Sequence, residues 1–67
     1  MEMVHVLSSN VESIGYSNNV LRVKFLSGAL YEYYNVSYDV YLAFLSASSK
    51  GKFVHYQLSR FPYRRIG

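Results

Sequence analysis

The sequence predicts a small α+β domain: an antiparallel β-sheet of about three strands packed against two short helices, in the order β-β-β-α-α. Two patterns indicate this fold. Apolar and polar residues alternate in the first half of the chain, which is typical of half-buried strands. In the second half apolar residues recur at helical spacing, and serines stand where helices begin. The chain has 67 residues, so we expect one domain, residues 1–67.

Alternation places the strands in residues 11–17, 20–26 and 29–36. The turn signal Ser27-Gly28 separates the last two, and their register follows from the side chains. A two-residue turn would set Val23 opposite Glu32 and mix the core and solvent faces. A three-residue loop keeps the apolar face intact, pairs opposite charges and gives Gly28 the position that needs a positive φ. Its expected pairs are Val23 with Tyr31, Leu21 with Tyr33 and Arg22 with Glu32.

Two helices are expected in the second half. Ser37 is a suitable N-cap for the first, and Asp39 lies in the first turn, where the helix dipole favours an acid. We expect Gly51 and the neighbouring serines to interrupt this helix, and a shorter one to cover residues 52–59. Pro62 then ends helical structure, so the tail is expected to be extended. The apolar stripe of the first helix consists of Val40, Phe44 and Ala47, with Tyr41 and Leu45 beside it.

The composition indicates a soluble, cytoplasmic protein with an interface. There is no cysteine, no apolar run near the roughly 18 residues of a membrane span, and no recognisable signal peptide. Aromatic residues make up 18% of the chain, and eight of them are tyrosines, more than so small a core can hide. Exposed tyrosine suits contact with a ligand or another subunit, and small domains without disulfides often oligomerise. We therefore expect a homo-oligomer with no membrane association.

Positive charge is confined to the last third of the chain. Residues 1–44 contain two basic and four acidic side chains, whereas residues 45–67 contain five basic and no acidic ones. This imbalance favours a polyanionic partner such as nucleic acid, a nucleotide or phosphate. The alternative is that the lysines and arginines only keep a tyrosine-rich surface soluble.

The stretch Ser49-Lys50-Gly51-Lys52 is a candidate anion site. If Ser49 caps the second helix, the next backbone amides are unpaired donors at a positive helix end, and Gly51 lets a phosphate approach them. The alternative is a simple turn between helices.

The tail "RFPYRRIG" interleaves arginine with aromatic residues, a combination that suits phosphate pairing and base stacking. Arg60, Arg64 and Arg65 are candidate phosphate ligands, and Tyr63 is a candidate stacking residue. Tyr31 and Tyr33 are further stacking candidates. The alternative assigns these aromatic residues to the core, and we favour core for one of the strand tyrosines and a pocket wall for the other.

Catalysis is not indicated. The two histidines lie far apart in the sequence, no thiol is present, and the carboxylates are scattered without spacing for acid–base or metal chemistry. No glycine-flanked nucleophile motif occurs. We therefore expect a protein that is not an enzyme and needs no cofactor or metal.

Four short motifs in order give the chain a family resemblance. They are Ser27-Gly28, Tyr31-x-Tyr33, Ser49-Lys50-Gly51 and Tyr63-Arg64, within "LRVKFLSGALYEYYNV", "YLAFLSASSKGKF" and "FPYRR". With "SSNVESIGYS" before them, these segments resemble the KTSC domain over nearly the whole chain. This family occurs at the C-terminus of some lysyl-tRNA synthetases and alone in small bacterial and phage proteins. The resemblance implies RNA binding, which has been proposed for the family.

Charge, tyrosines and resemblance together lead to one main hypothesis, a small phosphate-binding module for RNA or another nucleic acid. A second hypothesis is a phage-type protein that sequesters a nucleotide-derived signal in a pocket between subunits. A third is a protein-interaction or assembly module whose interface is rich in tyrosine.

Overall fold

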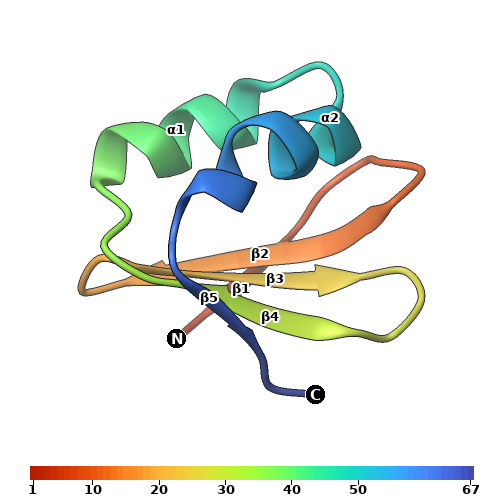
Figure 1. Cartoon of the computed structure of the whole chain (residues 1–67). Coiled ribbons are helices and arrows are strands. Elements are labelled where there is room, and N and C mark those ends of the chain that lie inside the picture. The colour runs from red at the N-terminus through yellow and green to blue at the C-terminus, as the bar shows by residue number, and fades with distance from the viewer.

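A five-stranded antiparallel sheet carries both helices on one of its faces (Figure 1). The computed structural model describes all residues, 1–67. The strands lie in sequence order across the sheet, and the chain runs through both helices between the fourth strand and the fifth. The α+β prediction is confirmed. The elements are β1 Met3–His5, β2 Val11–Ser17, β3 Val20–Phe25, β4 Leu30–Tyr33, α1 Tyr38–Ser46, α2 Lys50–Tyr56, the 3-10 helix η1 Leu58–Arg60, and β5 Tyr63–Arg65.

The two edge strands, β1 and β5, raise the strand number from the predicted three or so to five. Each has only three residues, which is too short for an alternating pattern to stand out. All three residues of β5 are exposed, so apolar periodicity gives no signal there. The tail is extended as expected, and backbone pairing with β4 makes it a strand.

The β3–β4 hairpin has the predicted register. Leu21 pairs with Tyr33, and the charged pair of Arg22 and Glu32 lies one step along. The loop is closed by hydrogen bonds from the Phe25 amide to Ala29 O and from the Gly28 amide to Phe25 O, both 2.9 Å long. Gly28 has a φ of 97°, a conformation that a residue with a side chain rarely adopts. Hydrophobic pattern and turn chemistry therefore specify the same pairing.

The β2–β3 turn is tied to the segment that leads into α1. Asn18 and Asn19 have φ values of 50° and 64°, which suit the two central residues of a type I′ turn. The Val36 amide donates to Asn19 O at 2.9 Å, and the Tyr16 hydroxyl donates to Val36 O at 2.7 Å. These contacts fix where the chain leaves the sheet and begins the helical layer.

Both helices begin at the predicted serines. Ser37 Oγ accepts from the Val40 amide, and Ser49 Oγ accepts from the Lys52 amide. The predicted bounds of the second helix were wrong, because α2 already begins at Lys50 and contains Gly51. It ends at Tyr56, and the rest of the predicted segment forms η1. Gly51 therefore lies inside a helix and does not separate two helices.

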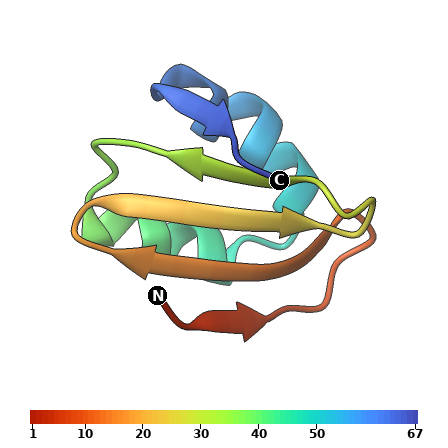
Figure 2. The same ribbon diagram turned by 90° about the horizontal axis from the view of Figure 1, so that it is seen from below.

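The core lies between the helices and the sheet. Figure 2, turned to view the sheet from below, shows both helices behind it and the outer face uncovered. Phe44 of α1 and Phe53 of α2 stack with ring centroids 5.0 Å apart, which joins the two helices. Neither helix has the length and apolar composition to cross a membrane. The buried apolar residues are Val11, Ile14, Leu21, Val23, Tyr33, Val36, Phe44 and Leu58.

Candidate functional site

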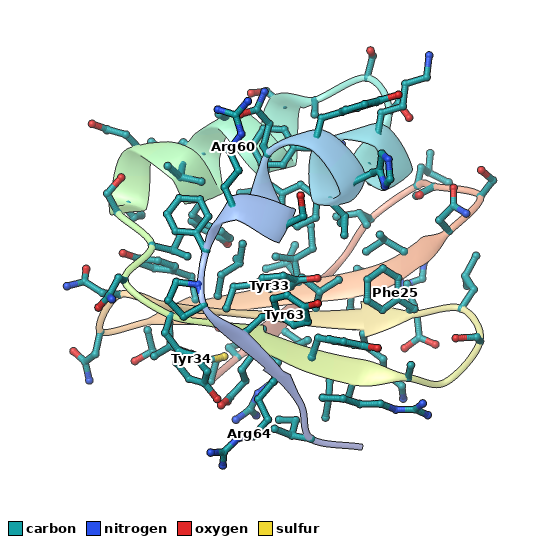
Figure 3. All side chains as sticks on the ribbon, in the orientation of Figure 1. Phe25, Tyr33, Tyr34, Arg60, Tyr63 and Arg64 are labelled. Atoms are coloured by element: carbon teal, nitrogen blue, oxygen red, sulfur yellow. The ribbon has the colours of Figure 1, made fainter.

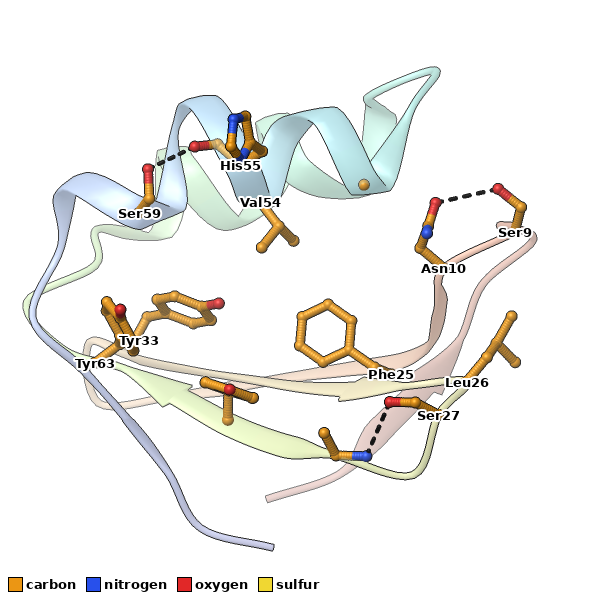
Figure 4. Close-up of a pocket in the computed structure, with 13 residues that line it drawn as sticks. Ser9, Asn10, Phe25, Leu26, Ser27, Tyr33, Val54, His55, Ser59 and Tyr63 are labelled. Carbon is orange, nitrogen blue, oxygen red and sulfur yellow. Dashed lines mark hydrogen bonds between the residues drawn. The ribbon is translucent and has the colours of Figure 1, made fainter.

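A groove of about 660 Å³ lies between α2 and the side of the sheet formed by β3, β4 and β5 (Figure 4). Its lining comes from segments far apart in the sequence. The loops before β2 and after β3 close one end, and α2 with η1 forms the roof. The helices pack over the middle of the sheet, so this flank is left open.

Four aromatic side chains, which we call the groove cluster, line the sheet side: Phe25, Tyr31, Tyr33 and Tyr63. The ring centroids of Tyr31 and Tyr33 are 6.4 Å apart, and Tyr63 lies 6.1 Å and 5.6 Å from them. Phe25 meets Tyr31 edge-on at 5.6 Å. These spacings are those of mutually packed aromatic rings. The structure thus brings the three candidate stacking tyrosines together on one surface.

The three tyrosines differ in burial. Tyr33 is 4% exposed and belongs to the core, Tyr31 is half-buried, and Tyr63 is 57% exposed. Burial raises the pKa of Tyr33 to about 12, and the neighbouring tyrosines add to the effect. The hydroxyls of Tyr31, Tyr33 and Tyr63 make no hydrogen bond within the chain, and no fully buried side-chain oxygen or nitrogen lacks a partner. Solvent therefore reaches the Tyr31 and Tyr33 hydroxyls, and Tyr63 is itself exposed.

Polar groups surround the aromatic surface. Ser9, Asn10 and Ser27 lie at one end, and His55 and Ser59 lie along the roof. Ser59 Oγ donates to the His55 carbonyl at 2.6 Å, which ties η1 to α2. An aromatic groove with hydrogen-bonding groups at its ends is chemically suited to a planar heteroaromatic ring.

The candidate anion stretch is engaged within the protein. Ser49 Oγ caps α2, and Lys50 Nζ donates to Ala47 O at 2.5 Å, at the end of α1. A Cβ at Gly51 would lie 2.7 Å from Asn10 Oδ1, so glycine makes room for that side chain. These contacts give Ser49, Lys50 and Gly51 roles in joining the helices and the β1–β2 loop.

The remaining candidate phosphate ligands lie on separate surfaces. Lys52 lines a shallow hollow at the α1–α2 turn, and Arg60 lines another between α1 and η1, beside Asp39. Figure 3 shows Arg60 on the helix side and Arg64 below the sheet. Arg65 donates from Nε to Gly67 O at 2.8 Å. The structure does not gather these cations at one point.

The outer face of the sheet carries a row of charges. Arg22 Nη2 lies 2.6 Å from Glu32 Oε2, and Arg64 is the register partner of Glu32 on β5. The Tyr34 hydroxyl donates to Glu32 Oε1 at 3.1 Å. The hydrogen bond from Arg22 is the main cause that lowers the pKa of Glu32, against a smaller opposing effect of burial. Glu32 thus partly neutralises this face.

The histidines and carboxylates do not converge. No group of three or more histidine, aspartate or glutamate side chains is placed to hold a metal ion. His5 lies on edge strand β1 and His55 on α2.

Comparison with known proteins identifies the family. The sequence model of the KTSC domain matches residues 7–61. The chain belongs to the KTSC domain family. A crystal structure of a KTSC domain protein from Yersinia pestis matches with a TM-score of 0.92 and 35% identity, over 98% of this chain and 97% of that one.

Two bacterial sequences also match the KTSC domain over most of its length. A protein of Tsukamurella paurometabola is 40% identical over 55 residues, 79% of this chain and 82% of the relative. A protein of Stutzerimonas stutzeri is 43% identical over 54 residues, 78% of this chain and 76% of the relative.

The motifs that carry the resemblance meet at the groove. Each of the four short motifs contributes to its lining: Ser27 from the first, both tyrosines of the second, Gly51 from the third and Tyr63 from the fourth. In the KTSC domain these motifs, separated along the chain, therefore form one surface.

Sequence reasoning missed the polar side chains that line the groove. They belong to Ser9, Asn10, Ser27, His55 and Ser59, and the sequence had indicated Ser27 only as part of a turn. These residues come from loops and helices whose meeting depends on the tertiary fold. One signal was present, because a glycine within a helical segment can mark close approach of another group. Here that group is Asn10.

Proposed function

We propose that this KTSC domain is a non-catalytic module that binds single-stranded nucleic acid, RNA in the first place, with a base held in the groove. The observation that carries the proposal is the groove cluster, an aromatic surface left open to solvent on one flank of the sheet. Aromatic side chains bind unpaired bases by stacking, at about 1–3 kcal/mol per base.

The dimensions of the groove support this ligand class. Its volume of about 660 Å³ lies within the range of roughly 300–1,000 Å³ that is typical of small-ligand pockets. Tyr63 is the most exposed of the three tyrosines and is thus the ring best placed for direct stacking.

The positions of the cations favour a polymer. The groove lining contains no lysine or arginine, whereas Lys52 and Arg60 line hollows elsewhere on the helical side and Arg64 lies below the sheet. A mononucleotide in the groove would have no cation beside its phosphate. A strand that passes over the domain can place successive phosphates against cations on different surfaces.

A second candidate is binding of a small nucleotide in a pocket shared by two subunits, as in sequestration of a nucleotide-derived signal. The open side of the groove favours it, because a second copy of the chain would enclose the ligand and supply cations from its own surface. Such a site would be closed, and its affinity would depend only weakly on salt.

The test is fluorescence anisotropy with labelled single-stranded RNA octamers at low salt. Tyr63→Ala should lower affinity about fivefold to hundredfold, the equivalent of one lost stacking contact. Tyr38→Ala is the matched control, since Tyr38 is 58% exposed but lies on α1, away from the groove. We expect its affinity to equal that of the unaltered protein.

Salt dependence separates the two candidates. For RNA the logarithm of the binding constant should fall linearly with the logarithm of salt concentration, with a slope of about −0.7 per phosphate contact. Saturable binding of a mononucleotide with little salt dependence would support the second candidate instead. Absence of RNA binding at low salt, or equal loss in both tyrosine variants, would overturn the main proposal.

A further inference from the structure

Asn10 is an exposed residue at the end of the groove away from Tyr63 (Figure 4). It lies in the loop between β1 and β2, and both of its backbone groups are bonded. Its amide donates to Ser8 Oγ at 3.0 Å, and its carbonyl accepts from the Leu26 amide at 2.9 Å. The second contact joins two loops that close this end. The position of Asn10 is therefore set by the fold.

The side-chain amide of Asn10 has one engaged atom and one free atom. Oδ1 accepts from the Ser9 hydroxyl at 3.1 Å and packs against Gly51 of α2. No hydrogen bond within the chain uses Nδ2. An amide whose oxygen is engaged and whose NH₂ is unpaired presents donors to a ligand.

Ser27 presents a second donor at the same end. Its Oγ accepts from the Ala29 amide at 3.4 Å, so its hydroxyl proton is available. Figure 4 shows Ser27 and Asn10 at the same end of the groove, with Phe25 between them and Tyr33. The edge of a base that lies on the aromatic surface would meet these two donors.

We propose that Asn10, with Ser27, reads the edge of the bound base and selects keto bases, guanine and uracil, over adenine. This inference rests on the proposed function. Guanine offers the adjacent acceptors N7 and O6, and uracil offers carbonyl oxygens, so both suit a donor pair. Adenine places the donor N6 amino group beside its N7 acceptor. The usual two-bond recognition of adenine by asparagine uses Oδ1 as the acceptor, and here Ser9 already donates to that atom while Gly51 of α2 packs against it, which restricts the approach of a second donor.

Inosine and adenosine provide the sharpest pair of probes, because they share the same purine ring and N7 acceptor and differ in the carbonyl or amino group at position 6, with the accompanying hydrogen at N1. The experiment compares RNA octamers that carry adenosine or inosine at the central positions, by fluorescence anisotropy. We expect the unaltered protein to bind the inosine octamer about threefold to tenfold more tightly, as for one net hydrogen bond.

Two variants and one control test whether Asn10 causes the preference. Asn10→Asp keeps the acceptor for Ser9 and removes the donor, so the preference should disappear or reverse. Asn18→Asp introduces the same charge in the β2–β3 turn and should keep the preference while lowering affinity for both octamers equally. Gly51→Ala places a methyl group 2.7 Å from Asn10 Oδ1, so the Asn10 side chain must move and the preference should disappear.

The outcomes separate this inference from the proposed function. Equal binding of the two octamers, or a preference that survives Asn10→Asp, overturns the role of Asn10 and leaves RNA binding in place. If neither octamer binds, the proposed function falls, and this inference falls with it.

Discussion

Two tyrosine clusters on the same face of the sheet differ in what their hydroxyl groups contact. The anchoring cluster consists of Tyr16, Tyr38 and Tyr41, with Tyr16 and Tyr41 stacked at 5.0 Å. Its central hydroxyl, on Tyr16, donates to Val36 O and lies 3.1 Å from Asn19 Oδ1. The other two hydroxyls of the anchoring cluster, on Tyr38 and Tyr41, and all the tyrosine hydroxyls of the groove cluster have no partner in the chain, so Tyr16 alone carries the difference.

The difference shows that tyrosine content alone does not identify an interface. The anchoring cluster uses rings and a hydroxyl to hold α1 on β2, and this is a structural role. The groove cluster also contains three tyrosines, beside Phe25, yet none of their hydroxyls bonds within the protein. A tyrosine is thus more informative about ligand binding when its hydroxyl is accessible and unpaired than when its ring is merely exposed.

Removing the hydroxyl of Tyr16 is expected to have the largest effect on stability. Tyr16→Phe leaves the carbonyl of Val36, a fully buried residue, without its side-chain donor, and such a loss costs about 1–3 kcal/mol. Tyr31→Phe is the matched control in the groove cluster and should change the free energy of unfolding by less than about 0.5 kcal/mol. Urea denaturation of both variants measures the difference. Equal losses would remove the distinction between the clusters.

Alkaline pH should reveal the burial of Tyr33. Its pKa is about 12 in the folded protein against 10.0 for the free side chain. Between these values the unfolded chain binds fewer protons than the folded one, so stability falls as pH rises from about 10 to 12. Thermal melts across this range should show a steeper decline for the unaltered protein than for Tyr33→Phe. If the Tm of both proteins declined in parallel, Tyr33 would not be the cause, and its raised pKa would be contradicted.

Removing the hydroxyl of Tyr34 is expected to have the smallest effect on stability. This residue is intermediate between the two clusters. Its hydroxyl has a partner, Glu32 Oε1, but the bond lies on the outer face of the sheet, where solvent competes with it. Tyr34→Phe should therefore lower Tm less than Tyr16→Phe does, measured by circular dichroism. A larger drop in Tm would show that the outer face contributes more than its exposure implies.

The sequence predicted the parts of the fold that repeat a local pattern. Alternation together with the Arg22–Glu32 charge pair was sufficient for the β3–β4 register, and Ser37 was sufficient for the start of α1. Gly51 misled the boundary prediction, because glycine is a poor helix former. Its presence within α2 is explained by Asn10, a contact between distant segments that local propensity does not contain.

The candidate site was predictable in its aromatic part and not in its polar part. Tyr31, Tyr33 and Tyr63 lie together because two of them share a strand face and the third pairs with that strand. The presence of these tyrosines in the sequence was a sufficient signal for an aromatic surface. Asn10 and Ser27 lie in loops without a motif, and the pairing of Val11 with Phe25 and the hydrogen bond from the Leu26 amide to Asn10 O bring these loops together.

The pairing of β5 has a consequence for how the domain opens. It is the only pairing in the sheet whose partners are separated by both helices, and it involves one edge strand of three residues. Such long-range, exposed pairing is costly in chain entropy, so β5 should detach in local fluctuations that leave β2, β3 and β4 folded. Because Tyr63 detaches with it, a ligand that contacts Tyr63 binds only the closed form. Occupancy of the groove and protection of the β5 amides from hydrogen exchange are thus linked in a single equilibrium.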